Sequence, residues 1–449
     1  MNPLKISVTG VRGIVGKTLT PLLAVRFSEA FATYVGGGDV AVCRDTRPSG
    51  GMVSCAVTAG LLAAGARPVD LGVTPVPTME HLVSRSGVRG GIAVSAGHNP
   101  PEWNALKFVG GDGIYLDQRE GEELLDIFHL GKSTRAAWNR IPRVKTLPGA
   151  ADAHLEKILA SVDAALIRSA RLKIAVDISG GACGGLVGRL LENLGCESVV
   201  LNGEPGRKMP SFPEPAPENM GLLETVVRAA RADAGFMFDT GGERLGIVTD
   251  EGTALAENST LLVCMLSALR RRPGPVVTNL STTRAVEIVA RGFGVPVFRV
   301  PTGQAHVSRE AKKRCAAVAG EGSGGVVVPA VQWSQDSIAS MALVLDFLAG
   351  GGEKLSTAAR RLPRLAMRKT GIAMDFKNVH SAMERVRKRV EKGAKGARLD
   401  FTDGVRMDWK DSWAHVRASN TESLIRIIAE AETVERAAEI SAWAEGLLR

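Results

Sequence analysis

Residues 94–100 (VSAGHNP) combine residue types that suit phosphate chemistry. They directly follow an apolar run, and a strand that leads into a tight turn of small residues and a proline is typical of a reactive loop at a sheet edge. His98 and Asn99 can bond phosphate or backbone groups, and Lys107 follows in WNALKF as a charge or a proton carrier. A single loop histidine is usually structural, so the prediction of a reactive loop rests on the whole heptad.

Residues 10–18 (GVRGIVGKT) follow the first strand-like run and end in the GKT of a P-loop. The P-loop pattern requires a glycine five residues before its final glycine, and that position is Val11, so the sequence excludes a P-loop. Two interpretations stay open. One is a plain turn, and the other is a turn that directs Arg12 toward phosphate, whose oxygens match the guanidinium fork.

Residues 238–244 (FDTGGER) place two carboxylates in a loop after the apolar run DAGFMF. Asp239 and Glu243 could donate oxygen ligands to Mg²⁺, which takes an octahedron of oxygens and accepts some of them from substrate phosphate. Two carboxylates four positions apart are a weak metal signal, so a loop without a metal stays open as the alternative.

Two further loops carry groups that suit a phosphorylated sugar. Residues 416–422 (VRASNTE) offer a guanidinium, two hydroxyls, an amide and backbone N–H groups on one turn, a set that binds phosphate well. The alternative for this segment is a capped surface turn. Residues 320–325 (GEGSGG) place one carboxylate and one hydroxyl in flexible backbone, which suits sugar hydroxyls.

Alternating strand-like and helix-like runs must position these loops. The rhythm begins at the N-terminus and restarts near residues 150 and 255, so three similar α/β units are expected in succession. Past about residue 366 the pattern changes to β–α–β–β–α, which predicts a small α+β domain. The expected strands include 4–9, 39–43, 67–71, 91–95 and 275–278 and a hairpin at 399–416, and the expected helices include 21–35, 51–65, 77–86, 150–167 and 255–270.

The composition excludes several classes of protein. Of 449 residues, 45% are hydrophobic and 23% are charged, so each unit can bury a core and extended disorder is not expected. The six cysteines lack metal-ligand spacing and the N-terminus lacks an apolar signal segment, so a cytoplasmic protein without membrane association is expected. The net charge of +9 suits an acidic ligand, but aromatic residues are scarce and the basic segment 383–392 stands alone, which disfavours nucleic-acid binding.

Taken in order, these motifs resemble the α-D-phosphohexomutase family of phosphoglucomutases, phosphomannomutases and phosphoglucosamine mutases. The resemblance extends over essentially the whole chain and rests on VTGVRGIVG, CRDTRPSG, SAGHNP, FDTGGERLGIV, GEGSGG and RASNTE in the family's order and spacing. It implies an α/β fold with three related α/β/α domains that have mixed sheets, plus a C-terminal α+β domain similar to the TATA-box-binding protein, around a central cleft. The expected domains are residues 1–148, 149–253, 254–366 and 367–449.

The resemblance also implies a chemistry. A phosphoserine in the SAGHNP loop donates its phosphoryl group to a hexose 1- or 6-phosphate, and the bisphosphorylated sugar reorients and returns the other phosphate. Mg²⁺ held by three aspartates bridges the serine phosphate, residues 320–325 recognise sugar hydroxyls, and residues 416–422 bind the non-reacting phosphate. His306, in PTGQAH, matches a substrate-facing position more loosely. The positions that keep their family counterparts are Arg12, His98, Asn99, Lys107, Arg244, Glu321, Ser323, Arg417, Ser419, Asn420 and Thr421.

Two glycines depart from the family pattern. Gly97 occupies the phosphoserine position, and Gly241 occupies one of the three aspartate positions, which leaves Asp239 and Glu243 as the candidate metal ligands. Nucleophilic catalysis requires a nucleophile, and glycine has none. Ser95 and His98 are the candidate substitutes, although a displacement of a few ångström spoils in-line transfer.

Both departures affect phosphoryl transfer, whereas the groups expected to bind sugar and phosphate remain. The first hypothesis is therefore a hexose-phosphate-binding pseudoenzyme with lost or much reduced intramolecular phosphotransferase activity, which binds Mg²⁺ weakly or not at all. The alternative is an active mutase, an isomerase of carbohydrate metabolism, that uses Ser95 or His98 and an activator of the glucose 1,6-bisphosphate type. The expected partners are hexose phosphates, with no membrane or nucleic acid. A regulatory protein partner and a monomeric or homodimeric state stay open.

Overall fold

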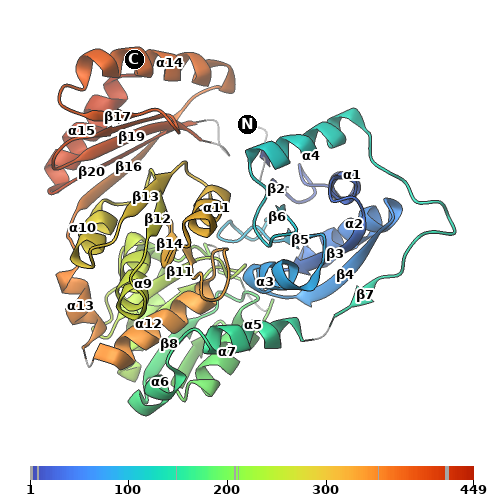
Figure 1. Ribbon diagram of the computed structural model, residues 1–449, viewed down its shortest axis with the longest axis horizontal. Helices are drawn as coiled ribbons and strands as arrows, with labels where there is room; N and C mark the ends of the chain where they lie inside the picture. Colours follow the sequence, from blue (N-terminus) through green and yellow to red (C-terminus); the bar gives the residue numbers. More distant parts are fainter. Residues whose placement is uncertain are drawn as a thin grey trace.

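The computed structural model describes residues 4–7, 10–147, 149–206, 209–210, 212–351, 353–419 and 424–448. Figure 1 shows three α/β units and a smaller C-terminal domain (orange to red) that lies beside the third unit, near β13 and α10. The expected architecture of three related α/β units followed by an α+β domain is confirmed.

The first unit is built on a mixed sheet with the strand order β1-β2-β6-β5-β3-β4-β7. Side chains alternate between its two faces: Val40 and Val42 pack with α1, α2 and α4, whereas Ala41 and Cys43 pack with α3 on the other face. This period of two, apolar on both sides, is the pattern of a strand buried on both faces. The elements are β1 (Lys5–Ser7), β2 (Gly10–Ile14), α1 (Pro21–Tyr34), β3 (Gly38–Arg44), α2 (Gly50–Ala63), β4 (Ala66–Val73), α3 (Val76–Ser86), β5 (Gly90–Val94), β6 (Trp103–Val109), α4 (Gln118–Leu130) and β7 (Lys145–Thr146).

The second unit has the strand order β11-β10-β8-β9, and the third has the order β13-β12-β14-β15. The second contains α5 (Ala150–Leu159), α6 (Ala164–Ala170), β8 (Lys173–Asp177), α7 (Gly184–Asn193), β9 (Glu197–Leu201), the 3₁₀ turn η1 (Pro217–Asn219), α8 (Gly221–Ala230), β10 (Ala234–Phe238) and β11 (Leu245–Thr249). The third contains α9 (Asn258–Arg271), β12 (Val276–Asn279), α10 (Ala285–Gly292), β13 (Val297–Val300), α11 (Gln304–Arg314), β14 (Val318–Gly320), β15 (Val326–Val327), α12 (Ser337–Gly351) and α13 (Leu355–Arg361).

The second and third units share one hydrophobic core, to which the apolar helix α12 contributes most of its length. Its one acidic residue, Asp346, is buried but accepts hydrogen bonds from Ser267 (3.0 Å), Arg271 (2.7 Å) and the backbone of Asp163 (2.8 Å). A buried carboxylate is tolerated only with such partners. Over the described ranges, no helix is both long enough and apolar enough to cross a membrane.

Two expectations about helices and strands are wrong in detail. The single helix expected at 150–167 is two helices, because Asp163 caps a new helix by accepting from the Leu166 N–H at 3.0 Å. The C-terminal prediction omitted β20 (Leu424–Ala431), which pairs with both β16 (Ala366–Ala373) and β19 (Trp413–Ala418). Most of β20 is buried, so it lacks the alternation of apolar and polar residues that marks a half-exposed strand.

The C-terminal domain is an antiparallel sheet with the order β16-β20-β19-β18-β17. The basic segment 383–392 lies in α14, where Val386 and Val390 are buried against the sheet and the charged residues between them are exposed, as a solvated helix face requires. The remaining elements are β16 (Ala366–Ala373), α14 (Phe376–Gly393), β17 (Arg398–Asp400), β18 (Val405–Asp408), β19 (Trp413–Ala418) and α15 (Val434–Gly446).

The same local construction recurs at the candidate loops. In each of the first three units a strand is followed by an antiparallel partner, and the connecting residues are 95–102, 239–244 and 321–325. In the C-terminal domain, β19 and β20 form the corresponding antiparallel pair. The fold therefore repeats one motif, an antiparallel pair of strands whose connecting loop bears the polar candidate residues.

A buried chain of hydrogen bonds joins the three α/β units. Thr78 Oγ1, from α3, lies 2.9 Å from His154 Nδ1 in α5, and His154 Nε2 lies 2.7 Å from Asp336 Oδ2, just before α12. All three residues are fully buried. Burial alone would raise the pKa of Asp336, but His154 and further hydrogen bonds hold it below its usual range. The chain therefore couples the packing of the three units.

We expect His154→Ala to weaken this junction, because the substitution leaves Asp336 and Thr78 buried without a shared partner. Loss of its hydrogen-bond partner typically costs a buried group about 1–3 kcal/mol, and more when that group is a carboxylate. Differential scanning calorimetry should therefore show a clearly lower Tm, while His380→Ala, which truncates an exposed histidine on α14, should leave the Tm unchanged. Equal Tm values for the two variants would contradict this role.

Candidate functional site

Neighbouring strands of the first sheet bring the candidate groups together. β2 carries Arg12, and β6, which pairs with β2, carries Lys107. β6 also pairs with β5, and the connection between these two strands is the 95–102 loop. Arg12, Lys107 and this loop therefore lie side by side although they are far apart in the sequence.

A buried arginine that the sequence analysis did not single out holds this loop. The Arg47 guanidinium donates to the carbonyl oxygens of Gly97 and Asn99, each at 2.7 Å, and to those of Pro100 at 2.6 Å and Trp103 at 3.0 Å. Four carbonyl groups on one rigid cation fix the backbone of the loop. Arg47 lies in the quoted motif CRDTRPSG, but nothing in that motif alone indicates which arginine turns inward.

Asp45 joins the same loop to the second unit. Its Oδ2 atom lies 3.1 Å from Arg47 Nε, 2.8 Å from Ser95 Oγ and 3.0 Å from Thr240 Oγ1. Ser95 Oγ also accepts from the Gly97 N–H at 3.2 Å. Ser95 is fully buried, and its hydroxyl is used in these two hydrogen bonds, which hold the loop in place.

Gly97 lies at the point where a nucleophile would face the charged groups. A Cβ atom at this position would lie 2.9 Å from Asp239 Oδ2, 3.8 Å from Lys107 Nζ and 3.9 Å from Glu243 Oε2. The φ of Gly97 is +55°, a region that L residues adopt only at a cost. The backbone thus presents residue 97 to the site, but glycine contributes no reactive atom there.

His98 and Asn99 lie in a strongly positive environment. Arg12 Nη1 donates to Asn99 Oδ1 at 2.7 Å. The charge of Arg244, burial, and the charges of Arg12 and Lys107 together hold the pKa of His98 well below its usual range, so its imidazole is neutral at pH 7. Such a group of cations suits a phosphate dianion.

The acidic loop between β10 and β11 faces Gly97. Asp239 Oδ1 accepts the backbone N–H groups of Gly242 (2.9 Å), Glu243 (2.8 Å) and Arg244 (3.2 Å), which leaves only Oδ2 directed toward residue 97. Burial and then the charge of Glu243 raise the pKa of Asp239. Arg244 itself pairs with Glu214 at 3.0 Å.

Both carboxylate oxygens of Glu243 already have partners. Oε2 forms a short ion pair with Lys107, and Oε1 accepts from the Tyr115 hydroxyl at 2.6 Å. Burial alone would raise the pKa of Glu243, but Lys107 and Tyr115 lower it, so the group is ionised. Tyr115 was missed by sequence reasoning, since no motif surrounds it.

These residues do not fit the Mg²⁺ site that the family resemblance implies. Asp239 offers one free oxygen, Glu243 offers none without loss of its ion pair, and Gly241 has no side chain. A Cβ at Gly241 would lie 3.0 Å from Ser95 Oγ and 3.2 Å from Glu243 Oε2, so Glu243 occupies space that a larger residue would need. Among the residues that the structure describes, no group of three His, Cys, Asp or Glu side chains is placed to hold a metal ion.

The third unit contributes a carboxylate in a defined orientation. Glu321 Oε1 accepts from Asn279 Nδ2 at 2.6 Å and from the Gly303 N–H at 3.2 Å, and its Oε2 accepts from Gln335 Nε2 at 2.9 Å. Ser323 is half-buried in the same loop, and His306 is half-buried in the first turn of α11. This loop also touches the acidic loop, because the Leu245 N–H donates to the Gly324 carbonyl at 3.1 Å.

The C-terminal domain places Arg417 near the third unit. Burial lowers the pKa of Arg417, while the negative charges of Asp403 and Glu321 oppose that effect. Its Nη1 donates to the Ala418 carbonyl at 3.2 Å, while its Nε is buried and has no partner among the described residues. Ser419, two positions along the chain, is also buried. Asn420 and Thr421 lie outside the described residues, so their positions are not part of this site description.

The described candidates of the first three units thus form one chain of contacts. The 95–102 loop meets the acidic loop at Gly97, and the acidic loop meets the 321–325 loop at Leu245. Arg417, in the C-terminal domain, is near enough for the charge of Glu321 to influence its pKa. The charged candidates are the cations Arg12, Lys107, Arg244 and Arg417 and the carboxylates Asp239, Glu243 and Glu321.

Models of known families match the chain in four segments. They are described as domains I, II and III of phosphoglucomutase/phosphomannomutase, each an alpha/beta/alpha domain, and as the C-terminal domain of that family. The matched residues are 4–135, 152–252, 256–365 and 372–443, respectively.

Individual relatives are similar along nearly their whole length. A probable phosphoglucosamine mutase of Methanopyrus kandleri is 34% identical over 437 residues, 96% of this chain and 95% of the relative. A phosphoglucomutase/phosphomannomutase of Thermococcus kodakarensis is 31% identical, with 96% and 95% coverage. The crystal structure of a phosphoglucomutase/phosphomannomutase family protein from Burkholderia thailandensis is 28% identical, with a TM-score of 0.84, and the match covers 99% of this chain and 96% of that one.

The order of the loops, the repeated antiparallel pairs that carry them and these full-length similarities agree with one another. The resemblance inferred from the motifs is therefore confirmed: the chain belongs to the phosphoglucomutase/phosphomannomutase family of α-D-phosphohexomutases.

Proposed function

We propose that this protein binds hexose phosphates and has lost, or retains only in much reduced form, the intramolecular phosphotransferase activity of a mutase. Gly97 carries the proposal, because residue 97 faces Asp239, Lys107 and Glu243 but supplies no nucleophile. The one hydroxyl of the same loop, Ser95, is fully buried and engaged with Asp45.

The binding groups support the other half of the proposal. Arg12, Arg244 and Lys107 surround His98 with positive charge, which favours one phosphate. Arg417, at the loop that resembles the family's second phosphate site, has a buried Nε atom for which the described part of the chain offers no partner. Glu321, oriented by Asn279 and Gln335, suits hydrogen bonds from sugar hydroxyls.

We further propose that this binding does not require Mg²⁺. A Cβ at residue 97 would lie 3.8 Å from Lys107 Nζ and 3.9 Å from Glu243 Oε2, so the Lys107 ammonium offsets the carboxylate that would otherwise repel a phosphate there. The site residues predicted from the sequence, the domain boundaries at 148, 253 and 366, a cytoplasmic location, a regulatory protein partner and a monomeric or homodimeric state all stay predictions.

One observation favours the alternative of an active mutase. His98 is half-buried and neutral at pH 7, the form in which an imidazole can accept a phosphoryl group. It belongs to the same loop as Gly97, so it is the residue to test as a substitute nucleophile.

The first experiment separates these two functions. The purified protein is incubated with Mg²⁺, a catalytic amount of glucose 1,6-bisphosphate and, in turn, glucose 1-phosphate, mannose 1-phosphate or glucosamine 1-phosphate, and the corresponding 6-phosphate is measured. We expect no turnover. Turnover that disappears in His98→Ala or Ser95→Ala would establish the mutase alternative instead.

Calorimetry of the same sugars tests the binding itself. Arg417→Ala removes charge-assisted hydrogen bonds worth about 1.5–3 kcal/mol, so Kd should rise about 10- to 100-fold. Arg398→Ala, at an exposed position on the edge strand β17 of the same domain, is the matched control and should bind like the unaltered protein. Absence of binding in the unaltered protein would exclude the proposed function.

Chelation tests the independence from metal. Hexose-phosphate binding should be the same in excess EDTA and in excess Mg²⁺, whereas Lys107→Ala should weaken it in both conditions. Binding that EDTA abolishes would show that a metal site forms despite the engaged oxygens of Glu243.

Restoring both family residues tests whether Gly97 and Gly241 account for the lost chemistry. Gly97→Ser with Gly241→Asp should acquire a phosphoryl group on residue 97 from glucose 1,6-bisphosphate and Mg²⁺, as detected by peptide mass spectrometry. Gly97→Ala with Gly241→Asp is the matched control and should acquire none there. An unmodified serine variant would show that the ion pair of Lys107 with Glu243 prevents the reaction even when a nucleophile is present.

A further inference from the structure

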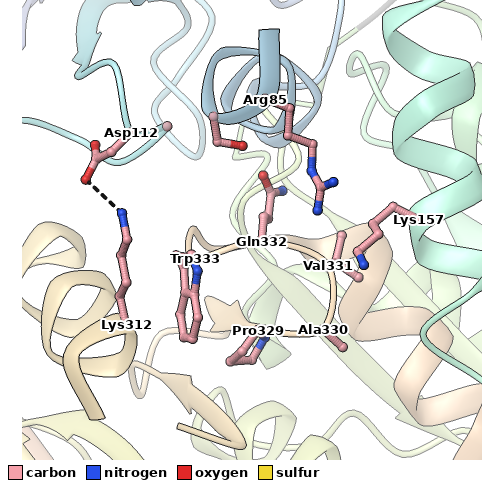
Figure 2. A pocket seen from close by; sticks show the side chains of 11 residues that line it. Arg85, Asp112, Lys157, Lys312, Pro329, Ala330, Val331, Gln332 and Trp333 are labelled. Atoms are coloured by element: carbon pink, nitrogen blue, oxygen red, sulfur yellow. Dashed lines mark ion pairs between the residues drawn. The ribbon is translucent and has the colours of Figure 1, made fainter. Parts of the chain in front are cut away.

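A cavity lies at the junction of the three α/β units, and none of its lining residues belongs to the candidate loops. Its volume of about 530 Å³ is within the range of about 300–1,000 Å³ that is typical of small-molecule sites. Figure 2 shows side chains from all three units around it. The lining residues are Ser84, Arg85, Asp112 and Gly113 from the first unit, Lys157 from the second, and Lys312 and residues 329–333 from the third.

Two cations in this cavity have no acidic partner. Arg85, at the end of α3, and Lys157, in α5, point toward the same side of the cavity (Figure 2). In the described part of the chain, neither side chain makes an ion pair or hydrogen bond, whereas Lys312 lies 3.6 Å from Asp112 and is neutralised. Like charges that converge without a counter-charge repel each other, and a bound anion would relieve that repulsion.

An orphaned acceptor lies between the two cations and the aromatic wall. Gln332 is 6% exposed, and its Nε2 donates to Asp336 Oδ2 at 2.8 Å. Because a carboxylate requires a donor, this bond fixes the orientation of the amide, and the Gln332 Oε1 atom is buried with no partner in the described ranges. An unsatisfied buried acceptor destabilises the protein, and a ligand hydroxyl would satisfy it.

The opposite wall is flat and apolar. Trp333 is half-buried and stands beside Gln332, with Pro329 and Ala330 along the floor (Figure 2). An indole ring contributes a large, rigid apolar surface on which the carbon-bound face of a sugar ring can pack.

We propose that this cavity is a second ligand site, separate from the family's loops, for a phosphorylated sugar. Arg85 and Lys157 bind the phosphate, Gln332 Oε1 accepts a sugar hydroxyl, and Trp333 packs against the ring. A free hexose phosphate and a nucleotide sugar share this chemistry, so the test includes both.

Occupation of the site would act on the packing of the three units. Gln332 donates a hydrogen bond to Asp336, and the buried hydrogen bonds run on from Asp336 through His154 to Thr78. A ligand that contacts Arg85, Lys157 and Gln332 therefore contacts all three units at once. Because such a ligand binds only the assembled junction, it raises the Tm of the protein.

The test counts sites with glucose 6-phosphate and UDP-glucose in separate titrations of the full chain. Calorimetry should show two sites per chain for one of these ligands, and Arg85→Ser with Lys157→Ser should remove one of them, with Kd weakened at least about 10-fold. Arg417→Ala should weaken the other site only. Arg291→Ser with Lys388→Ser removes two exposed cations elsewhere and is the matched control for net charge.

A second readout does not depend on stoichiometry. Ligand binding in the cavity should change the tryptophan fluorescence and raise the Tm, and Trp333→Phe should remove the fluorescence change while keeping the Tm increase. If the double variant does not fold, Lys157→Ser alone serves in its place.

Three outcomes would overturn the proposal. They are a single site that survives Arg85→Ser with Lys157→Ser, two sites that both survive this double substitution, and inorganic phosphate that binds the cavity as tightly as the sugar ligand. The first two exclude the site, and the third excludes recognition of the sugar. None of them affects the proposed function of the loops, which Arg417→Ala reports separately.

Discussion

The buried ion pair between Asp45 and Arg47 is the interaction on which the candidate site depends. Both residues are 1% exposed, and charges removed from water must be fully satisfied by partners. Arg47 meets that requirement with four carbonyl groups of the 95–103 segment, and Asp45 meets it with Ser95 and with Thr240 of the second unit. The need to satisfy these two buried charges therefore fixes the conformation of the loop and attaches the loop to the second unit. This holds whichever side chain residue 97 carries.

The two unusual glycines are related through Glu243. Its Oε2 atom would lie 3.9 Å from a Cβ at residue 97 and 3.2 Å from a Cβ at residue 241. Gly241 leaves room for this carboxylate, which pairs with Lys107 and Tyr115, whereas a Cβ at residue 97 would only touch Glu243 and would crowd Asp239 instead. A site of this kind neutralises its own charges within the protein, which explains why its oxygens are not arranged around a metal.

Repetition explains how distant segments meet. Each of the first three units ends a strand in a connection to an antiparallel partner, and the C-terminal sheet has the corresponding pair of β19 and β20. The units are then held in register by a few buried polar contacts, of which the chain from Thr78 through His154 to Asp336 spans three units. Because these hydrogen bonds are directional, they determine how the loops face one another. The apolar core that the second and third units share stabilises their association without specifying its orientation.

The sequence by itself determined the family, the order of the α/β units and most of the candidate residues, because these depend on short motifs and on local periodicity. It also identified Gly97 and Gly241 as departures. It did not reveal Arg47 as the residue that fixes the loop, Tyr115 as a partner of Glu243, or β20 as a central strand. Those features depend on contacts between residues that are far apart in the chain, such as Lys107 and Glu243, and on burial, which removes the alternation that marks an exposed strand. Only the tertiary structure decided that Ser95 turns inward and that Glu243 is engaged, because both follow from which neighbours the folded chain places beside them.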